Sequence, residues 1–356
     1  MKDKAYLEVY NVIKNRIVDK AYRCGERLPS KRNLALEFGY SVITIEHAIE
    51  LLIDEGYLES KERSGYFVTY QDEDMMFQFP EENTLVRVQE FQTHYKDEEE
   101  FPISLYAKTV RRVLSNYQEY IFERSHNQGS EILREAISRY LKRSRGINVH
   151  SNQIVIGSGA EYLYGLVAQI LDEKRIGIED PSYEKIEKVY RAHGLEIERL
   201  KMGKDGIRST ELERAKVLTL HVTPYSSFPT KITADASKRS QYISWAKDRN
   251  GLIIEDDYDS EFSMLGKAED TLFSLEPKRS VIYLNTFSLT ISSAIRMGYM
   301  ILPEERCDEF MEKIAFYSCT VPLLEQLVLA EIINNGDFER HLNRVRRHRR
   351  IKNTRK

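Results

Sequence analysis

The chain has 356 residues, of which 41% are hydrophobic and 31% are charged, and its formal net charge is −3. A chain of this length folds into roughly two or three domains, and its small net charge excludes a general affinity for polyanions, so nucleic-acid binding requires a local surface. Cys24, Cys307 and Cys319 lie far apart, without the spacing of a metal site or a disulfide framework, which indicates a reducing cytoplasm and no bound metal. No long uncharged apolar run occurs, so we expect neither export nor membrane insertion.

The first seventy residues contain three helical patterns and a hairpin. Apolar residues recur at intervals of three and four from Tyr6 to Val18, which predicts an amphipathic helix. Ser30 is placed to cap a second helix that Gly39 ends, and Ser41 is placed to cap a third. Two short apolar runs around a charged turn then predict a two-stranded wing. A helix, a tight turn and a second helix form the geometry that places the second helix in the major groove of DNA.

These residues resemble a known DNA-binding domain. The string "GERLPSKRNLALEFG", the Ser-x-x-Thr helix start and "EGYL" followed by "SGYFV" resemble the winged helix-turn-helix of GntR-type bacterial transcription regulators, over about residues 4 to 70. The resemblance implies that groove and phosphate contacts come from the turn, the recognition-helix start and the wing. The DNA-binding residues that we expect are Ser30, Lys31, Arg32, Ser41, Thr44, Arg63 and Gly65.

One residue departs from that pattern, because Val42 stands where the family usually has an arginine. Residues 1–70 also hold equal numbers of basic and acidic side chains, so binding would depend on the separation of charge over the surface. The alternative is a winged helix retained for dimer contacts alone.

Residues 71–100 carry ten acidic and two basic residues and show no sustained helical or strand period, which predicts an acidic linker. This linker is either a solvated loop or an arm that competes with DNA.

From residue 101 to residue 356, helical patterns alternate with short apolar strands, which predicts an α/β layered domain. The clearest unit is a strand over Ile154 to Ile156, a small-residue turn, and a helix from Tyr162 onward whose first N–H groups could receive a phosphate. The later strands each end in polar residues. We therefore expect side chains from several strand ends to meet at one crevice.

Five segments in this region carry a second resemblance. The strings "SGAEYL", "EDPSY", "TPYSSFPTK", "IEDDYDSEF" and "NTFSLTISSAIRMGYMILP" are similar, in order and interval, to aminotransferase-like proteins of the pyridoxal phosphate-dependent aspartate aminotransferase fold. Joined to a GntR-type domain, such a fold resembles the MocR/GabR-type regulators. The resemblance implies a winged helix-turn-helix plus an incomplete aspartate-aminotransferase-like α/β/α domain that lacks most of its small C-terminal subdomain.

The resemblance also implies a cofactor site. Ser158, Gly159, Thr286, Ser288 and Arg296 would surround the phosphate of pyridoxal phosphate, Asp256 would face the ring nitrogen, and Tyr258 would face the ring hydroxyl. Tyr183 is a weaker candidate contact. A carboxylate at the ring nitrogen keeps it protonated, and an arginine fork grips phosphate oxygens.

Several residues depart from the aminotransferase pattern. Leu289 stands where the family has its Schiff-base lysine, so we expect no catalytic residue and, if pyridoxal phosphate binds, non-covalent binding. Tyr225 to Ser227 replace the usual Ser-His-Gln, Lys231 replaces a glycine, and Glu161 replaces a glutamine and adds an anion near the phosphate.

The basic run from Arg340 to Lys356 predicts a helix with either a solvated or a DNA-attracting face.

The favoured hypothesis is a cytoplasmic transcription regulator that binds double-stranded operator DNA as a homodimer. Its catalytically inactive aminotransferase-like domain would serve dimerisation and the sensing of a small-molecule effector, such as an amino acid or pyridoxal phosphate. The alternatives are a pyridoxal phosphate-dependent aminotransferase, or the product of a decayed gene.

Overall fold

A computed structural model describes residues 5–61, 64–71, 101–262 and 270–354. The chain divides into two compact units, Met1–Gln92 and Thr93–Lys356, and each is described by itself. The predicted linker falls almost wholly outside the described residues. No described helix combines the length and the apolar character needed to cross a membrane.

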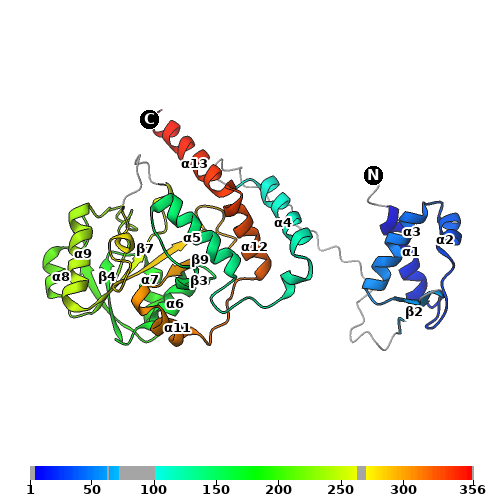
Figure 1. The fold of residues 1–356 in the computed structure, drawn as a ribbon, viewed down its shortest axis with the longest axis horizontal. Coiled ribbons are helices and arrows are strands. Elements are labelled where there is room, and N and C mark those ends of the chain that lie inside the picture. The colour runs from blue at the N-terminus through cyan, green and yellow to red at the C-terminus, as the bar shows by residue number, and fades with distance from the viewer. Residues whose placement is uncertain (1–4, 62–63, 72–100, 263–269, 355–356) are drawn as a thin grey trace. The chain divides into compact units, whose positions relative to one another are not determined.

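The N-terminal unit is a three-helix domain with a hairpin wing (Figure 1). Its elements are α1 (Ala5–Val18), α2 (Lys31–Phe38), α3 (Val42–Asp54), β1 (Leu58–Lys61) and β2 (Gly65–Val68). The apolar stripes of the three helices form one core, in which Val9, Ile13, Leu34, Ile45 and Ile49 are wholly buried. Burial of these stripes is the main stabilising term of a domain this small.

The predicted helix ends in this unit are confirmed. The Ser30 hydroxyl accepts a hydrogen bond from the Asn33 N–H at 3.2 Å, and the Ser41 hydroxyl accepts one from the Thr44 N–H at 3.2 Å. Gly39 ends α2 with a left-handed φ of 70°, a conformation that glycine adopts without the steric cost of a Cβ. The wing pairs antiparallel, with Leu58 opposite Val68 and Lys61 opposite Gly65.

The C-terminal unit is built on a seven-stranded sheet with the order β3-β9-β8-β7-β6-β4-β5. The strands are β3 (Ile154–Gly157), β4 (Arg175–Asp180), β5 (Glu196–Lys201), β6 (Thr219–Val222), β7 (Leu252–Asp256), β8 (Val281–Thr286) and β9 (Gly298–Ile301). Strand β9 runs antiparallel to both of its neighbours, and the strands from β8 to β5 are parallel. The carboxyl ends of the parallel strands therefore meet at one edge of the sheet.

Helices cover both faces of this sheet (Figure 1). They are α4 (Ile103–Tyr117), α5 (Glu131–Arg145), α6 (Ala160–Ile170), α7 (Glu184–Ala192), α8 (Ser209–Arg214), α9 (Ala236–Arg249), α10 (Leu272–Leu275), α11 (Cys307–Ile314), α12 (Leu323–Asn334) and α13 (Asp337–Thr354). Short 3-10 turns lie at Gln118–Phe122, Ser151–Gln153, Ser260–Phe262 and Glu304–Arg306.

Alternate residues of each strand enter two separate cores, as the pleat of a sheet requires. In β7, Ile253 packs with α5, α9 and α12, whereas Leu252 and Ile254 pack with α6, α7 and α11. The predicted α/β/α layering is therefore observed. One predicted boundary differs, since α6 starts at Ala160, immediately after the glycine turn, and not at Tyr162.

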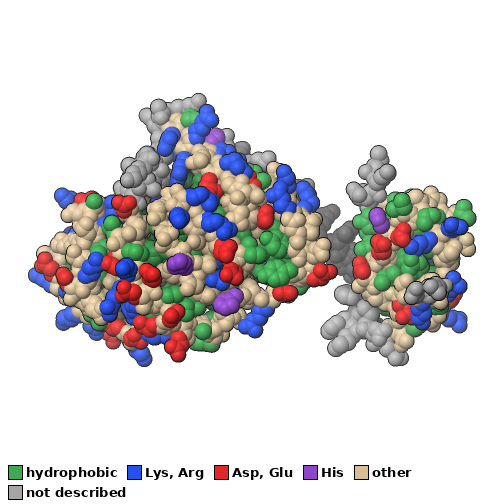
Figure 2. All heavy atoms as spheres, viewed as in Figure 1, with side chains coloured by type: hydrophobic (Ala, Val, Ile, Leu, Met, Phe, Trp, Pro, Cys, Tyr) green, Lys and Arg blue, Asp and Glu red, His purple; other side chains and the backbone are tan. Residues whose placement is uncertain are grey.

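The basic run at the end of the chain lies on α13. Phe338, Leu342 and Val345 are buried on one side of this helix and anchor it to the core. Basic side chains gather over the other side (Figure 2). This amphipathic packing explains the helix without any nucleic-acid contact.

Candidate functional site

The start of the recognition helix α3 is exposed and polar on one side. The Ser41 hydroxyl lies 2.8 Å from the Thr44 hydroxyl, in addition to capping the helix. A hydroxyl that accepts from the backbone keeps its own proton available. The Ser30 hydroxyl therefore keeps its proton available, whereas one of the Ser41 and Thr44 hydroxyls already donates to the other.

The basic side chains of the turn differ in their availability. Lys31 forms an ion pair with Glu46 and lies 5.4 Å from the centre of the Tyr66 ring. The hydrogen bond to Glu46 raises the pKa of Lys31 and holds its ammonium against α3. Arg32 is exposed and forms no ion pair with another described residue, so it is the stronger candidate phosphate contact. Arg63 lies outside the described residues.

Sequence reasoning missed Arg27. Its guanidinium lies against the wing, where a Cβ added to Gly65 would come within 3.1 Å of the Arg27 Nε. Gly65 also has a φ of 106°, a backbone conformation that favours glycine there. Arg27 stands in the quoted string "GERLPSKR" beside the residues that were singled out, but its contact with the wing depends on the tertiary fold. It joins the candidate phosphate contacts.

The two residues that follow Ser41 are apolar and accessible. Val42 is 42% exposed and Ile43 is 66% exposed, although both belong to a helix whose other apolar residues form the core. In place of a basic contact, the recognition helix therefore presents methyl groups at its N-terminal turn.

At the carboxyl edge of the large sheet lies a pocket of about 310 Å³. It contains Asp256, Tyr258, Thr286, Ser288, Leu289 and Arg296, together with Tyr164, Tyr183, Lys185, Phe228 and Glu161. Five of the seven residues predicted for a cofactor site thus line one cavity. The other two, Ser158 and Gly159, lie in the turn before α6, where a Cβ on Gly159 would come within 3.2 Å of the Arg296 Nη2.

Asp256 forms a buried polar end of the pocket. Its Oδ2 accepts a hydrogen bond from the Tyr164 hydroxyl at 2.5 Å, and the His221 Nε2 lies 3.5 Å from the same atom. The other ring nitrogen of His221 is 2.8 Å from the Tyr190 hydroxyl. The His221 Nε2 is buried and has no hydrogen-bond partner among the described residues. The carboxylate is therefore held in place on a polar scaffold, as a group that receives a ligand N–H must be.

Tyr258 is already engaged within the protein. Its hydroxyl donates to the Ser226 carbonyl at 2.7 Å and lies 3.4 Å from the Lys231 Nζ. Ser226, Lys231 and Arg296 are three of the six described non-glycine residues with a left-handed φ. Such strained backbone tends to gather at binding sites; here Arg296 lines the pocket, and Ser226 and Lys231 contact its lining residue Tyr258.

The pocket also has an ionic part. Glu161 accepts from the Arg296 Nη2 at 2.9 Å and from the Lys185 Nζ at 2.7 Å. These contacts, led by the hydrogen bond from Lys185, lower the pKa of Glu161 to about 2. Leu289 extends nearby with 51% of its surface exposed.

The arrangement fits pyridoxal phosphate only in part. Asp256 fits a ring nitrogen, and the Tyr164 hydroxyl that donates to it fits a group that orients that carboxylate. Leu289 offers no amine for a covalent link, and Arg296 is already paired with Glu161. The pocket thus keeps a carboxylate suited to a ring nitrogen, and at residue 289 it has a side chain without an amine.

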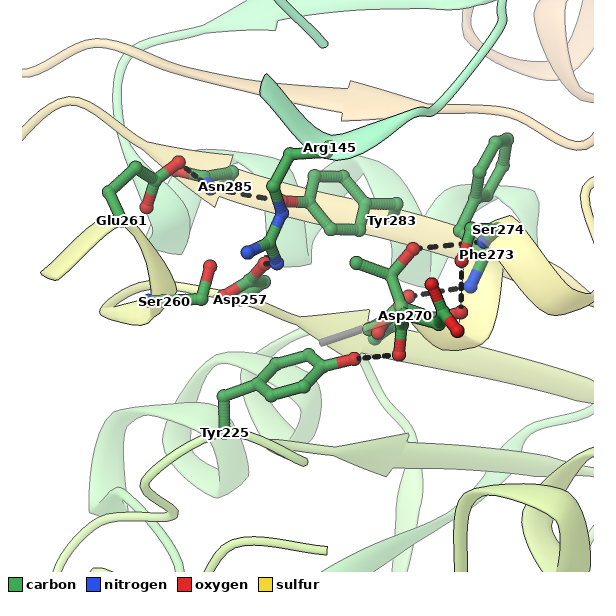
Figure 3. A network of polar contacts seen from close by, with 12 residues as sticks. Arg145, Tyr225, Asp257, Ser260, Glu261, Asp270, Phe273, Ser274, Tyr283 and Asn285 are labelled. Carbon is green, nitrogen blue, oxygen red and sulfur yellow. Dashed lines mark hydrogen bonds and ion pairs between the residues drawn. The ribbon is translucent and has the colours of Figure 1, made fainter. Parts of the chain in front are cut away.

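A second polar cluster lies directly behind the pocket and was not predicted. The Arg145 Nη2 lies 2.6 Å from the Asp257 Oδ2, and the Tyr283 hydroxyl donates to the same carboxylate at 2.8 Å (Figure 3). Both charged groups are almost fully buried. Adjacent aspartates in the string "IEDDYD" thus serve different ends: Asp256 faces the pocket, and Asp257 forms a buried ion pair.

Comparisons with known proteins agree with this geometry. Residues 5–68 match the family "Bacterial regulatory proteins, gntR family", and residues 95–356 match "Aminotransferase class I and II". The chain therefore belongs to the GntR-type helix-turn-helix regulators that carry an aminotransferase class I and II domain, of the MocR type.

Particular relatives are similar over nearly the whole chain. An uncharacterized HTH-type transcriptional regulator of Bacillus subtilis, YdeL, is 33% identical over 96% of this chain and 76% of its own length. The probable rhizopine catabolism regulatory protein MocR of Rhizobium meliloti is 26% identical over 96% of this chain and 74% of its own length. The chain thus spans about three quarters of the length of these relatives.

The solved structures support the fold of the large unit. A Pyrococcus horikoshii kynurenine aminotransferase, solved in complex with PMP, matches with a TM-score of 0.63 and 21% identity, over 69% of this chain and 64% of its own. An archaeal alanine:glyoxylate aminotransferase matches with a TM-score of 0.61 and 24% identity, over 68% of this chain and 62% of its own. The predicted aminotransferase-like fold is confirmed.

Proposed function

We propose that this protein regulates transcription by binding operator DNA through α2, α3 and the wing, while its large unit senses a small molecule without catalysing amino transfer. The single observation that carries the proposal is the contrast between the two sites. The winged helix has its caps in place and Arg32 exposed, whereas the pocket has Leu289 where the Schiff-base lysine is expected.

The sensing role is supported by what the pocket retains. Asp256 keeps a fixed and buried carboxylate, and the aromatic rings of Tyr183 and Phe228 meet edge to face at a centroid distance of 6.0 Å. A concave site with aromatic walls and a few fixed polar groups is the usual form of a small-molecule site. Pyridoxal phosphate or a related ring would be held reversibly, by non-covalent contacts alone.

The remaining parts of the proposal follow from the DNA target. A homodimer would present two winged helices to two half-sites in register, and operator DNA places the protein in the cytoplasm. The proposed domains are the winged helix at residues 1–70, an acidic linker at 71–100 and the aminotransferase-like unit at 101–356.

A salt titration tests DNA binding. Fluorescence anisotropy with a labelled duplex from upstream of the protein's own gene should show binding that weakens steeply with salt, and Arg32→Ala should flatten the logarithmic slope by about one. Arg111→Ala, an exposed arginine on α4 in the large unit, is the matched control. Salt-insensitive binding, or none, would reject the DNA-binding role.

One observation favours the enzyme alternative: the Lys231 amine lies 3.4 Å from the Tyr258 hydroxyl, at the pocket. Borohydride reduction in the presence of pyridoxal phosphate, followed by peptide mass mapping, would detect a covalent link there. We expect Lys231 to remain unmodified, so that the wild type and Lys231→Met give the same peptide map. Turnover of an amino acid by the intact protein would replace the regulator model with an enzyme.

A further inference from the structure

Three charged side chains from separate elements meet at one end of the pocket. Glu161 comes from the first turn of α6, Lys185 from the first turn of α7, and Arg296 from the segment between β8 and β9. The Glu161 carboxylate bridges both cations, at 2.7 Å to Lys185 and 2.9 Å to Arg296. These three residues, which we call the ionic triad, line the same pocket as Asp256.

The carboxylate occupies the place where an anionic ligand group would interact best. Glu161 is the second residue of α6, and the N-terminal turn of a helix attracts anions through its free N–H groups and its dipole. It also takes up Arg296, the cation whose guanidinium lies against the Gly159 turn. The protein thus supplies its own anion at this position.

The charge of the ionic triad limits what else can bind there. One carboxylate against two cations leaves a net charge of +1, and a phosphate dianion would bring two further negative charges beside Glu161. Because the pKa of Glu161 is lowered to about 2, its charge persists across the neutral range. Repulsion between the two anions would therefore offset part of the attraction of a phosphate to Arg296 and Lys185 at every working pH.

We propose that Glu161 substitutes for the phosphate of the ligand, so that the pocket selects an unphosphorylated planar ring with a donor directed at Asp256. This inference rests on the proposed ligand-sensing function and adds the class of ligand. The unphosphorylated ring gains the contacts of Asp256 and the aromatic walls, and it leaves the ionic triad intact. A phosphorylated ring has to break the triad before Arg296 can grip it.

Pyridoxine and pyridoxine 5′-phosphate form a matched pair of probes, because they differ only in the phosphate and carry no aldehyde that would react with surface lysines. Isothermal titration calorimetry on the intact protein would give both dissociation constants. We expect the wild type to bind pyridoxine at least as tightly as its phosphate. In Glu161→Gln, the dissociation constant for the phosphate should fall about tenfold, whereas that for pyridoxine should change by less than about twofold.

Glu187→Gln is the matched control. The Glu187 carboxylate also bridges two cations, Arg191 and Arg199, and it stands on α7 outside the pocket. It should leave both constants unchanged. If Glu161→Gln proves unstable, Glu161→Ala provides a second variant that also removes the carboxylate, and it should show the same tighter binding of the phosphate.

The possible results distinguish a failure of the role proposed for Glu161 from a failure of the ligand-sensing function. The role of Glu161 is overturned if the wild type binds pyridoxine 5′-phosphate at least tenfold more tightly than pyridoxine and Glu161→Gln leaves that ratio unchanged. Ligand sensing would still stand in that case. Failure of both probes to bind both proteins overturns the ligand class and the sensing function together. Operator binding, measured on the same preparations, reports separately on the winged helix.

Discussion

The two units of this chain tolerate change at their functional sites in different ways. In the winged helix, an arginine position is filled by Val42, yet Arg32, Arg27 and the capped helix start remain on the surface. Phosphate contacts contribute separately, so the loss of one weakens binding by degrees. In the large unit, Leu289 stands where the aminotransferase resemblance implies the Schiff-base lysine, and its side chain has no amine to link an aldehyde. A site built from many equivalent contacts degrades gradually, whereas a site built around one nucleophile loses its chemistry at once.

The units also differ in buried charge. The described core of the winged helix is apolar, with its ion pairs at the surface. The large unit buries Arg145, Asp257, Glu179, Glu255 and Glu261 beneath the sheet edge. Buried charges are costly unless paired, so the stability of the large unit should respond to mutation and pH in ways that the winged helix does not.

The largest effect is expected at the Arg145–Asp257 pair. Arg145→Met would leave the Asp257 carboxylate buried without its cation, and the free energy of unfolding of the large unit should fall by about 3–5 kcal/mol. Urea denaturation followed by circular dichroism would measure it. Arg143→Met removes an exposed partner of Glu339 and should cost under about 1 kcal/mol. Equal costs for the two variants would show that the buried pair has no special role.

The pH response comes next. Burial raises the pKa of Glu179 from 4.5 to about 7, against the opposing hydrogen bonds from Ser227 and Thr223. Between these two values the folded state holds a proton that the unfolded state has released, so this group's contribution to stability falls as pH rises from about 4.5 through about 7. The large unit should lose up to about 3 kcal/mol from this group over that window.

Glu179→Gln removes the ionisation while keeping the shape of the side chain. Its denaturation midpoint should therefore vary less between pH 5 and pH 8 than that of the wild type. Glu184→Gln, an exposed residue on the first turn of α7, should follow the wild-type curve. A Glu179→Gln profile parallel to the wild type would assign the pH dependence to other buried carboxyls.

The winged helix should lose less from any single change. Ser41→Ala removes the cap on α3 and should lower the stability of the N-terminal unit by about 1 kcal/mol. Because the same hydroxyl belongs to the proposed DNA-binding surface, operator affinity should fall further than stability alone explains. Ser41→Asp retains a capping acceptor but introduces repulsion toward phosphates, so it should rescue the melting temperature and not the affinity. Recovery of both would assign Ser41 to folding only.

The smallest effect is expected where the family arginine is restored. Val42→Arg should add about one phosphate contact, seen as a logarithmic salt slope steeper by about one and a tighter complex at low salt. Val42→Gln, which adds length without charge, is the control. An unchanged slope in Val42→Arg would mean that residue 42 points away from the backbone of the duplex.

The apolar stripes, the capping serines and the glycine stops of the winged helix could be read directly from the chain, because each depends on residues a few positions apart. The alternation of strands and helices in the large unit was predictable for the same reason. The aminotransferase motifs even indicated which side chains would share a pocket, since Asp256 and Thr286 end two neighbouring parallel strands, and Tyr258 and Arg296 lie in the segments that follow those strands.

The contact partners of those side chains could not be predicted from the sequence, because they lie far away along the chain. Glu161 pairs with Arg296 across 135 residues, and Arg145 reaches Asp257 across 112. Arg27 lies against Gly65 only because the wing folds back onto the turn. Such contacts arise when separate strands and helices are brought into register by packing, and the free energy of each depends on burial and distance that no single segment encodes. The spacing of apolar residues along the chain determined which segments became helices and strands. The packing of those helices and strands then decided which charged side chains meet at each site.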